Sequence, residues 1–217
     1  INVADAGNYQ CIVTGSCGNA AYSGAVALTV FNTYELVSAS GDWNNPSSWS
    51  TGTVPTGSDT VFIPSGKSVN LTGNTAASCK SLTLKGTINI TGNSTLTGNP
   101  SGILKTFSGA NLQVEKYFPS GFDVYDVSGT TEFYGNTSQT IPQRFLGDLI
   151  LSGTGLKALE GTMSAQNLTI ESDATLDIAD DANLIQIFES WTNNGTFEGR
   201  NGTVEFQRVG EHFVGGI

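Results

Sequence analysis

Short runs in which one polar residue separates two apolar residues recur along most of the chain. Residues 82–84, 88–90 and 168–170, for example, read Leu-Thr-Leu, Ile-Asn-Ile and Leu-Thr-Ile. In an extended strand this alternation places both apolar side chains on the same face. Gly, Asn and Ser end the runs, and no segment carries apolar residues at the spacing of a helix. The pattern predicts an all-β protein made of many short strands.

A repeated pentapeptide indicates that these strands are stacked. Gly-Thr-Thr-Glu-Phe at 129–133 returns as Gly-Thr-Val-Glu-Phe at 202–206, and self-similarity at a fixed period is typical of solenoids. Leu149 and Leu168 are 19 residues apart, about the length of one coil of three short strands with their turns.

We therefore predict a right-handed parallel β-helix. Its apolar pairs would point into the cylinder, and the Thr, Asn, Gln and Asp residues between them would face solvent. Residues 81–84 and 167–170, which read Ser-Leu-Thr-Leu and Asn-Leu-Thr-Ile, are expected to be equivalent strands of different coils.

The first 31 residues follow a different pattern. Asp5, Gly7, Tyr9 and Cys11 alternate, a Gly/Ser/Asn turn follows, and residues 25–30 alternate again as Ala-Val-Ala-Leu-Thr-Val. This stretch resembles the last two strands, F and G, of an immunoglobulin-like domain. In that family the Tyr two residues before the Cys forms the tyrosine corner, and the Cys bridges to strand B. The resemblance gives these roles to Tyr9 and Cys11, but strand B has no counterpart in this sequence.

The sequence contains three cysteines, Cys11, Cys17 and Cys79. Cys11 and Cys17 are candidates for a disulfide, either with each other or with residues outside this sequence. Cys79 precedes an alternating strand and is expected to be a small buried residue.

The expected organisation is an immunoglobulin-like ending at 1–31, a linker at 32–41 and a β-helix at 42–217. Trp43 and Trp49 flank Pro46 ahead of the first regular strands. We expect the two rings to cap the open end of the solenoid. The alternative is a sugar-stacking platform.

Residues 41–84 contain Trp-Asn-Asn-Pro-Ser-Ser-Trp, Val-Pro, Gly-Ser-Asp-Thr-Val and Ser-Leu-Thr-Leu in succession. This stretch resembles the start of a β-helical module in large secreted surface proteins of Bacteroidota. Residues 191–197 and 202–206 are similar to the repeat of those modules. Immunoglobulin-like repeats often precede such modules in adhesin-like proteins exported by the type IX route. The resemblance implies a piece of a longer, extracellular cell-surface protein whose partners are glycans or other surface proteins.

Charge limits the possible partners. The chain has 9 Lys and Arg against 19 Asp and Glu, a formal net charge of −10. This charge repels phosphate backbones and anionic lipid head groups. We therefore expect no nucleic-acid partner, and the lack of a long apolar run predicts no membrane insertion.

Four carboxylates are candidates for catalytic residues, because β-helical polysaccharide lyases and hydrolases use clustered Asp together with a basic residue. They are Asp173, Asp177, Asp180 and Asp181. The last two lie in an Ala/Asp/Asn turn, which favours a solvated corner. The basic partner that a lyase needs would have to come from another coil, and Lys157 or Arg144 would reach the carboxylates only by chance.

The sequence disfavours both a calcium site and a catalytic triad. Asn183 adds an oxygen near the Asp turn, but an Asp-x-Asp-x-Asp-Gly loop is lacking. His212 is the only histidine and has no neighbouring nucleophile with an orienting acid, so we expect an outward strand residue. The sequence thus predicts no catalytic residue, cofactor or metal.

One aromatic segment, residues 117–125, breaks the strand pattern with Tyr117, Phe118, Phe122 and Tyr125. We expect a loop or lateral strand that packs over the side of the solenoid, or else a surface on which sugars stack. The leading functional hypothesis is a non-enzymatic structural and adhesion segment that acts as a stiff spacer or display scaffold. The alternative is a glycan-binding or polysaccharide-cleaving β-helix.

Overall fold

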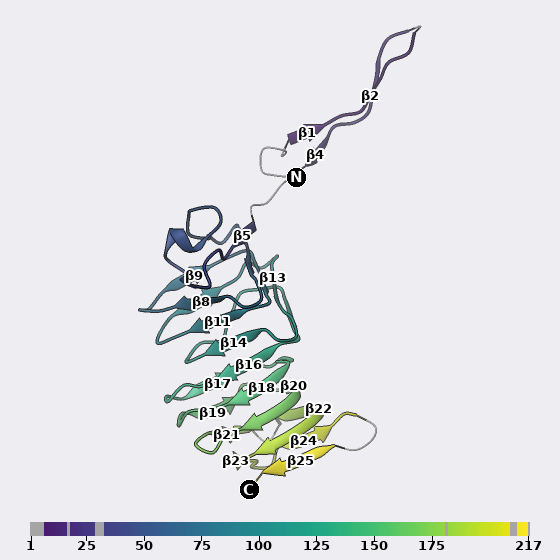
Figure 1. Cartoon of the computed structure of the whole chain (residues 1–217). Coiled ribbons are helices and arrows are strands. Elements are labelled where there is room, and N and C mark those ends of the chain that lie inside the picture. The colour runs from purple at the N-terminus through teal and green to yellow at the C-terminus, as the bar shows by residue number, and fades with distance from the viewer. Residues whose placement is uncertain (1–6, 17, 29–32, 181, 209–211, 217) are drawn as a thin grey trace. The chain divides into compact units, whose positions relative to one another are not determined.

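The structure, a computed structural model, describes residues 7–16, 18–28, 33–180, 182–208 and 212–216. Within these ranges the chain is all-β, and the only helical element is a 3₁₀ turn, η2 (Pro46–Ser48). The chain divides into two units, Ile1–Thr33 and Tyr34–Ile217 (Figure 1). The predicted all-β parallel solenoid is confirmed, and the immunoglobulin-like character of the first unit stays a prediction.

The first unit is a β-hairpin. Strand β1 (Gly7–Tyr9) pairs antiparallel with β4 (Val26–Leu28), and β2 (Ile12–Val13) pairs antiparallel with β3 (Ala21–Tyr22). The described apolar side chains of this hairpin, Tyr9 and Val26 among them, are largely exposed. Two strands alone bury too little surface to be stable in water.

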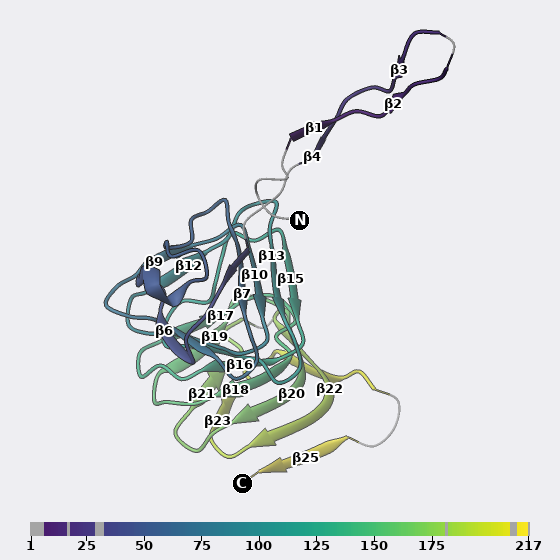
Figure 2. The same ribbon diagram turned by 45° about the horizontal axis from the view of Figure 1, so that its top comes forward.

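The second unit is a parallel β-solenoid of about seven turns, wound from three stacks of strands (Figure 2). The first stack is a five-stranded sheet of β5 (Thr33–Glu35), β7 (Thr60–Ile63), β10 (Ser81–Leu84), β13 (Ile103–Thr106) and β15 (Val124–Val127). The second stack is a ten-stranded sheet of β6 (Ser40–Asp42), β8 (Ser68–Leu71), β11 (Thr87–Ile90), β14 (Asn111–Val114), β16 (Thr130–Phe133), β18 (Asp148–Leu151), β20 (Met163–Ile170), β22 (Leu184–Asn193), β24 (Thr203–Phe206) and β25 (Phe213–Gly216).

The third stack is in two pieces. One piece contains β9 (Ala76–Ser78) and β12 (Thr95–Thr97), and the other contains β17 (Gln139–Ile141), β19 (Leu156–Leu159), β21 (Thr175–Asp177) and β23 (Thr196–Glu198).

Alternating burial builds the core. In strands such as β8, β11 and β18, half-buried and fully buried residues alternate, so that one apolar pair per strand faces inward. Leu149 pairs directly with Leu168, as the predicted 19-residue coil requires. Leu168 and Ile170 are fully buried while Thr169 between them is not. The predicted inward face is therefore confirmed for β20.

One expected equivalence between strands is wrong, and the two pentapeptide copies pair differently. The pentapeptide copies form β16 and β24, but the ladder that runs from β16 through β18, β20 and β22 ends on β25. Strand β24 instead pairs with the first half of β22. Residues 81–84 lie in the five-stranded sheet, whereas 167–170 lie in the ten-stranded one. The same alternation fits every face, so similar sequences occupy different faces.

The solenoid begins earlier than the predicted residue 42. Tyr34 and Leu36 are buried in its core, and the Leu36 amide donates to the Phe62 carbonyl at 3.1 Å. Most of the expected linker, 32–41, thus belongs to the first coil of the solenoid. This coil needs apolar residues of its own to cover the core of the next coil.

Trp43 and Trp49 lie beside β6, the outermost strand of the ten-stranded sheet, and both are buried. Their rings meet edge to face at 5.1 Å, and Trp49 Nε1 donates to the Trp43 carbonyl at 2.8 Å. Burial at this end confirms the capping interpretation and leaves neither ring free for a sugar.

Candidate functional site

A gap in the third stack creates the most distinctive surface of the solenoid. Strand β12 pairs with β9, and β17 pairs with β19, but no described ladder joins β12 to β17. The coil between them carries residues 115–123, here called the aromatic loop, in place of a third strand. Its only strand-like contact is a single bridge between Thr97 and Ser120.

The four predicted stacking residues do not form one platform. Phe122 is buried on Gly98, where a Cβ atom would lie 2.3 Å from the ring, so the loop needs glycine there. Tyr125, in β15, meets Phe122 edge to face at 5.8 Å, and Phe118 stacks on the core residue Phe133 at 6.0 Å. Phe118, Phe122 and Tyr125 therefore pack over the solenoid side, as the first interpretation expected.

Tyr117 differs from the other three rings. It is 43% exposed, and the Lys116 ammonium lies 4.9 Å from its ring centroid. Lys116 is fixed in turn by a 2.7 Å hydrogen bond to Asn93 Oδ1. Of the four aromatic residues, Tyr117 is the one placed to stack on a ligand.

Arg144 packs against the aromatic loop from the next coil. Its guanidinium carbon lies 3.7 Å from the Tyr125 centroid and 5.4 Å from that of Phe118. Its Nε is buried without a hydrogen-bond partner, and none of its nitrogens donates to another residue that the structure describes. Cation–π contact holds the group in place and leaves its N–H donors unused.

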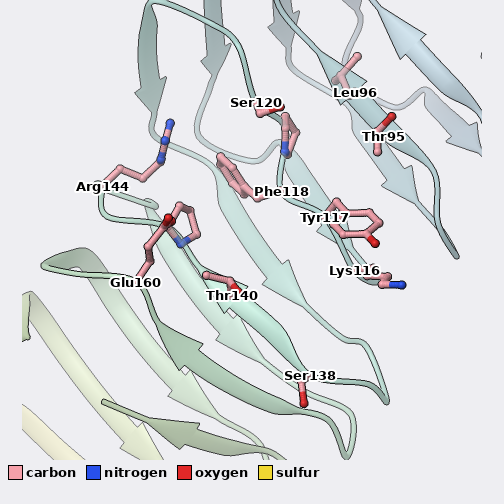
Figure 3. Close-up of a pocket in the computed structure, with 12 residues that line it drawn as sticks. Thr95, Leu96, Lys116, Tyr117, Phe118, Ser120, Ser138, Thr140, Arg144 and Glu160 are labelled. Atoms are coloured by element: carbon pink, nitrogen blue, oxygen red, sulfur yellow. The ribbon is translucent and has the colours of Figure 1, made fainter. Parts of the chain in front are cut away.

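Tyr117, Phe118 and Arg144 border a groove of about 410 Å³ (Figure 3). Four hydroxyl residues also line it, Thr95, Ser120, Ser138 and Thr140. Within the described ranges, no side-chain hydrogen bond ties these hydroxyls to the protein. Lys116 and Glu160 complete the charged lining, so two cations face one carboxylate in a chain of net charge −10.

A second hollow, of about 490 Å³, lies along the ten-stranded sheet and is lined by Asp148, Asn167 and Glu189 among others. The side chains of Asp148, Asn167 and Glu189 already have partners within the protein. Asn167 Nδ2 donates to Asp148 Oδ1 at 2.7 Å, Ser190 Oγ donates to Asn167 Oδ1 at 2.6 Å, and Arg208 pairs with Glu189. These contacts connect neighbouring coils along the sheet, so the lining of this hollow has a structural role.

Asp177 corrects the expectation that aspartates between apolar residues face solvent. It is buried, and Arg200 donates to its two carboxylate oxygens at 2.6 and 2.7 Å. The Ala179 amide adds a third hydrogen bond at 2.8 Å. The Arg200 hydrogen bond lowers the pKa of Asp177, assisted by the Ala179 amide, while burial opposes the shift. The carboxylate is thus committed to an ion pair.

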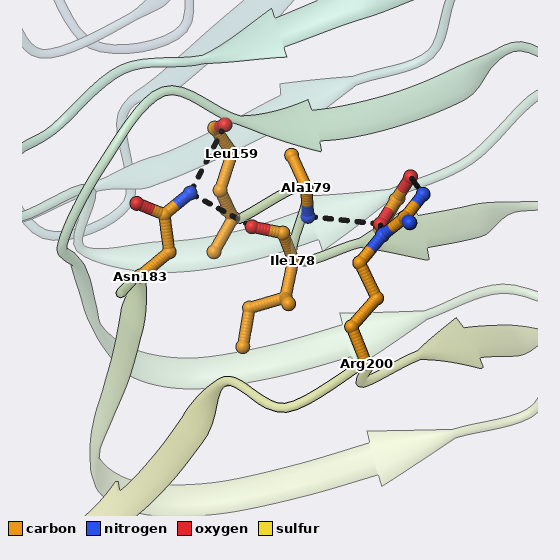
Figure 4. Close-up of polar contacts among 6 residues, drawn as sticks. Leu159, Ile178, Ala179, Asn183 and Arg200 are labelled. Atoms are coloured by element: carbon orange, nitrogen blue, oxygen red, sulfur yellow. Dashed lines mark hydrogen bonds and ion pairs between the residues drawn. The ribbon is translucent and has the colours of Figure 1, made fainter. Parts of the chain in front are cut away.

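The other members of the predicted acid set are not brought together. Asp173 and Asp180 are exposed, and Asp181 lies outside the described residues. Asn183 Nδ2 donates to the Ile178 carbonyl at 2.8 Å and closes the turn (Figure 4). Among the described residues, no three His, Cys, Asp or Glu side chains gather as a metal site would require.

Lys157, the other basic residue considered for a lyase, points into the coil. It is fully buried, and its Nζ donates to the carbonyls of Gly135, Gly153 and Gly155 at 2.8 to 2.9 Å. Burial lowers the pKa of Lys157 to about 8, opposed by the charge of Asp173. A side chain held in this way closes a turn and has no access to substrate.

Three other predicted residues have simple positions. His212 is half-buried just before β25, within 3.2 Å of the Glu189 carbonyl and 2.7 Å of the Arg208 carbonyl, and is not an outward strand residue.

Cys79 is buried as expected, and burial raises the pKa of its thiol to about 12. Cys11 is exposed and bonded to no other described cysteine, and Cys17 lies outside the described residues, so a disulfide between them stays a prediction.

Comparison with protein-family profiles, with curated proteins and with solved structures finds no match for this chain. No helix in the described ranges has the length and apolar character needed to cross a membrane.

Sequence reasoning missed the groove as a unit. Arg144 was considered only as a partner for the Asp turn, and the four hydroxyls look like ordinary turn and strand residues. The signal in the sequence was the interruption of the strand pattern at residues 117–125. A coil that lacks its third strand leaves a gap between the third-stack strands of the two adjacent coils.

Proposed function

We propose that this chain is a non-enzymatic structural segment of an extracellular, multidomain cell-surface protein, acting as a stiff spacer or display scaffold. The observation that carries the proposal is the unbroken parallel ladder of the second stack. It links every coil from β6 to β25 over a buried aliphatic core. Such a ladder resists bending and extension because each coil hydrogen-bonds to the next.

Sequence features support the extracellular setting. The antiparallel hairpin carries Tyr9 in β1, with Cys11 two residues later, as in the last strands of an immunoglobulin-like domain. The likeness to Bacteroidota surface modules adds a type IX export route and an adhesin-like context. Glycans or other surface proteins are the proposed partners. Antibody labelling of intact cells that produce the parent protein tests this location, and a signal seen only after lysis would contradict it.

The mechanical role is tested by pulling the full chain from both ends in single-molecule force spectroscopy. Cooperative rupture should release roughly 600 Å if residues 34–217 extend at about 3.4 Å each. The Leu168→Asp variant should rupture at a lower force, and Thr169→Asp serves as its matched surface control. Smooth extension at low force, without rupture, would contradict the scaffold.

The enzymatic alternative predicts that the chain cleaves polysaccharides. If the chain is a scaffold, polysaccharides incubated with the native chain should yield no new reducing ends and no unsaturated products. Turnover that disappears in a chain carrying both Asp180→Ala and Asp181→Ala would replace the scaffold by a polysaccharide-cleaving β-helix.

A further inference from the structure

We propose that the groove beside the aromatic loop binds a saccharide bearing a carboxylate, with Arg144 pairing the carboxylate and Tyr117 stacking on the sugar ring. This adds a ligand site to a segment whose proposed role is mechanical.

The first support is the state of Arg144. A guanidinium offers five N–H donors in a planar fork that matches a carboxylate. Arg144 makes no ion pair with any described residue, although Glu160 lines the same groove. The other arginines that the structure describes, Arg200 and Arg208, are paired with Asp177 and Glu189. Arg144 is therefore a cation positioned by Tyr125 and Phe118, with donors available to a ligand.

The second support is the remainder of the lining. Sugars present hydroxyl groups that both donate and accept, and side-chain hydroxyls complement them because they do the same. Thr95 and Ser120 lie on one side of the gap, and Ser138 and Thr140 on the other (Figure 3). Elsewhere on the solenoid, hydroxyls such as those of Ser94 and Ser152 bond to neighbouring coils.

The third support is the exposed ring of Tyr117 at the edge of the groove. An aromatic face binds the apolar face of a sugar ring, and the Lys116 ammonium beside it adds a second positive charge. A neutral sugar would leave both cations unpaired. An acidic peptide would satisfy the cations, but it would leave the four hydroxyls with few partners, whereas the hydroxyls of a sugar pair with them. The combined chemistry favours a uronate-type sugar.

Calorimetric titration of the full chain with a hexuronate tetramer tests the proposal. The fully methyl-esterified tetramer is the matched control, because it keeps the sugar and removes the charge. We expect the acid to bind at least about tenfold more tightly than the ester, which corresponds to about 1.4 kcal/mol. This comparison uses the native chain, so it stands even if a variant fails to fold.

Variants then assign the contacts. Arg144→Gln should remove the preference for the acid over the ester, and Arg144→Lys should restore only part of it. Tyr117→Ala should weaken both probes about fivefold or more. Tyr22→Ala, an exposed tyrosine in the hairpin, should change neither affinity.

Several outcomes would overturn the proposal. They are equal binding of acid and ester by the native chain, no binding of the acid at millimolar concentration, and an unchanged preference in a folded Arg144→Gln variant. Tighter binding of a Glu hexapeptide than of the hexuronate would reassign the groove to acidic peptides. Tighter binding of a sulfated neutral tetramer would assign it to sulfate.

Discussion

At the scale of single residues, two charged side chains depart from the alternating pattern. The pattern predicts that buried side chains are apolar and that charged ones face solvent. Asp177 and Lys157 are both buried, and each is matched by partners fixed in neighbouring turns. Burying a charge is costly unless it is paired and hydrogen-bonded. Each group should therefore give the protein a stability that depends on pH.

Replacing Asp177 by Asn should lower the free energy of unfolding by about 1–2 kcal/mol at pH 7. A hydrogen-bonded ion pair contributes more than this when fully buried, but Arg200 is half exposed and solvent screens the pair. Because the folded-state pKa of Asp177 lies below its ordinary value of 3.8, this stability is complete above pH 3.8 and is lost as the pH falls through the folded pKa.

Urea unfolding at pH 7 and at pH 3 measures the effect. The difference between the native chain and Asp177→Asn should shrink at pH 3. Asp180→Asn, an exposed residue in the following turn, is the matched control and should change stability by less than about 0.5 kcal/mol at either pH. A difference that is the same at both pH values would show that charge plays no part.

Lys157 should have the opposite pH dependence. Its folded-state pKa of about 8 lies below the ordinary value of 10.5. Between these values the unfolded chain binds more protons than the folded chain, so the free energy of unfolding should rise with pH. The full shift corresponds to about 3 kcal/mol, and the three carbonyl acceptors, which favour the charged form, reduce it.

Comparison with Lys157→Met isolates this contribution from Cys79 and Tyr134, whose raised pKa values act in the other direction at alkaline pH. The native chain should gain stability over the variant between pH 8 and pH 10. An unchanged difference would mean that the carbonyls of Gly135, Gly153 and Gly155 fully compensate for burial.

At the scale of elements, strand β20 tests which face of a strand carries the core. Leu168→Asp should destabilise the protein by about 3–5 kcal/mol, because it buries a carboxylate among aliphatic side chains. Thr169→Asp, one residue on and facing outward, should cost less than about 1 kcal/mol. Chemical denaturation of both variants provides the comparison, and equal losses would reverse the face assignment.

Alternation was enough to predict the core face of strands such as β20, because period two depends only on neighbouring residues. It was not enough to assign strands to faces, because the strands of all three stacks carry the same pattern. Residues 81–84 and 167–170 read almost alike but lie in different sheets. The buried position of Lys157 was not predictable either, because its partners are the backbone carbonyls of three glycines. The groove was not predictable because Arg144 meets Tyr125 and Phe118 only after one coil has stacked on another.

At the scale of the whole molecule, the two units differ in how they are held together. The solenoid has a continuous core and ladders that connect successive coils. The described hairpin residues have paired backbones, but their apolar side chains remain exposed. Hydrogen bonds that no packed side chains protect open readily, whereas those inside a packed core open only by larger unfolding.

Hydrogen exchange followed by mass spectrometry should therefore separate the units in the intact chain. Peptides covering 7–16 and 18–28 should exchange within seconds, because a lone two-stranded hairpin is marginally stable. Peptides from β11, β14, β16 and β18 should stay protected for hours, because their strands are paired on both sides. Leu168→Asp should speed exchange in the solenoid peptides and leave the hairpin unchanged. Hairpin protection equal to that of β16 would show that the hairpin is held by packing that its exposed side chains do not reveal.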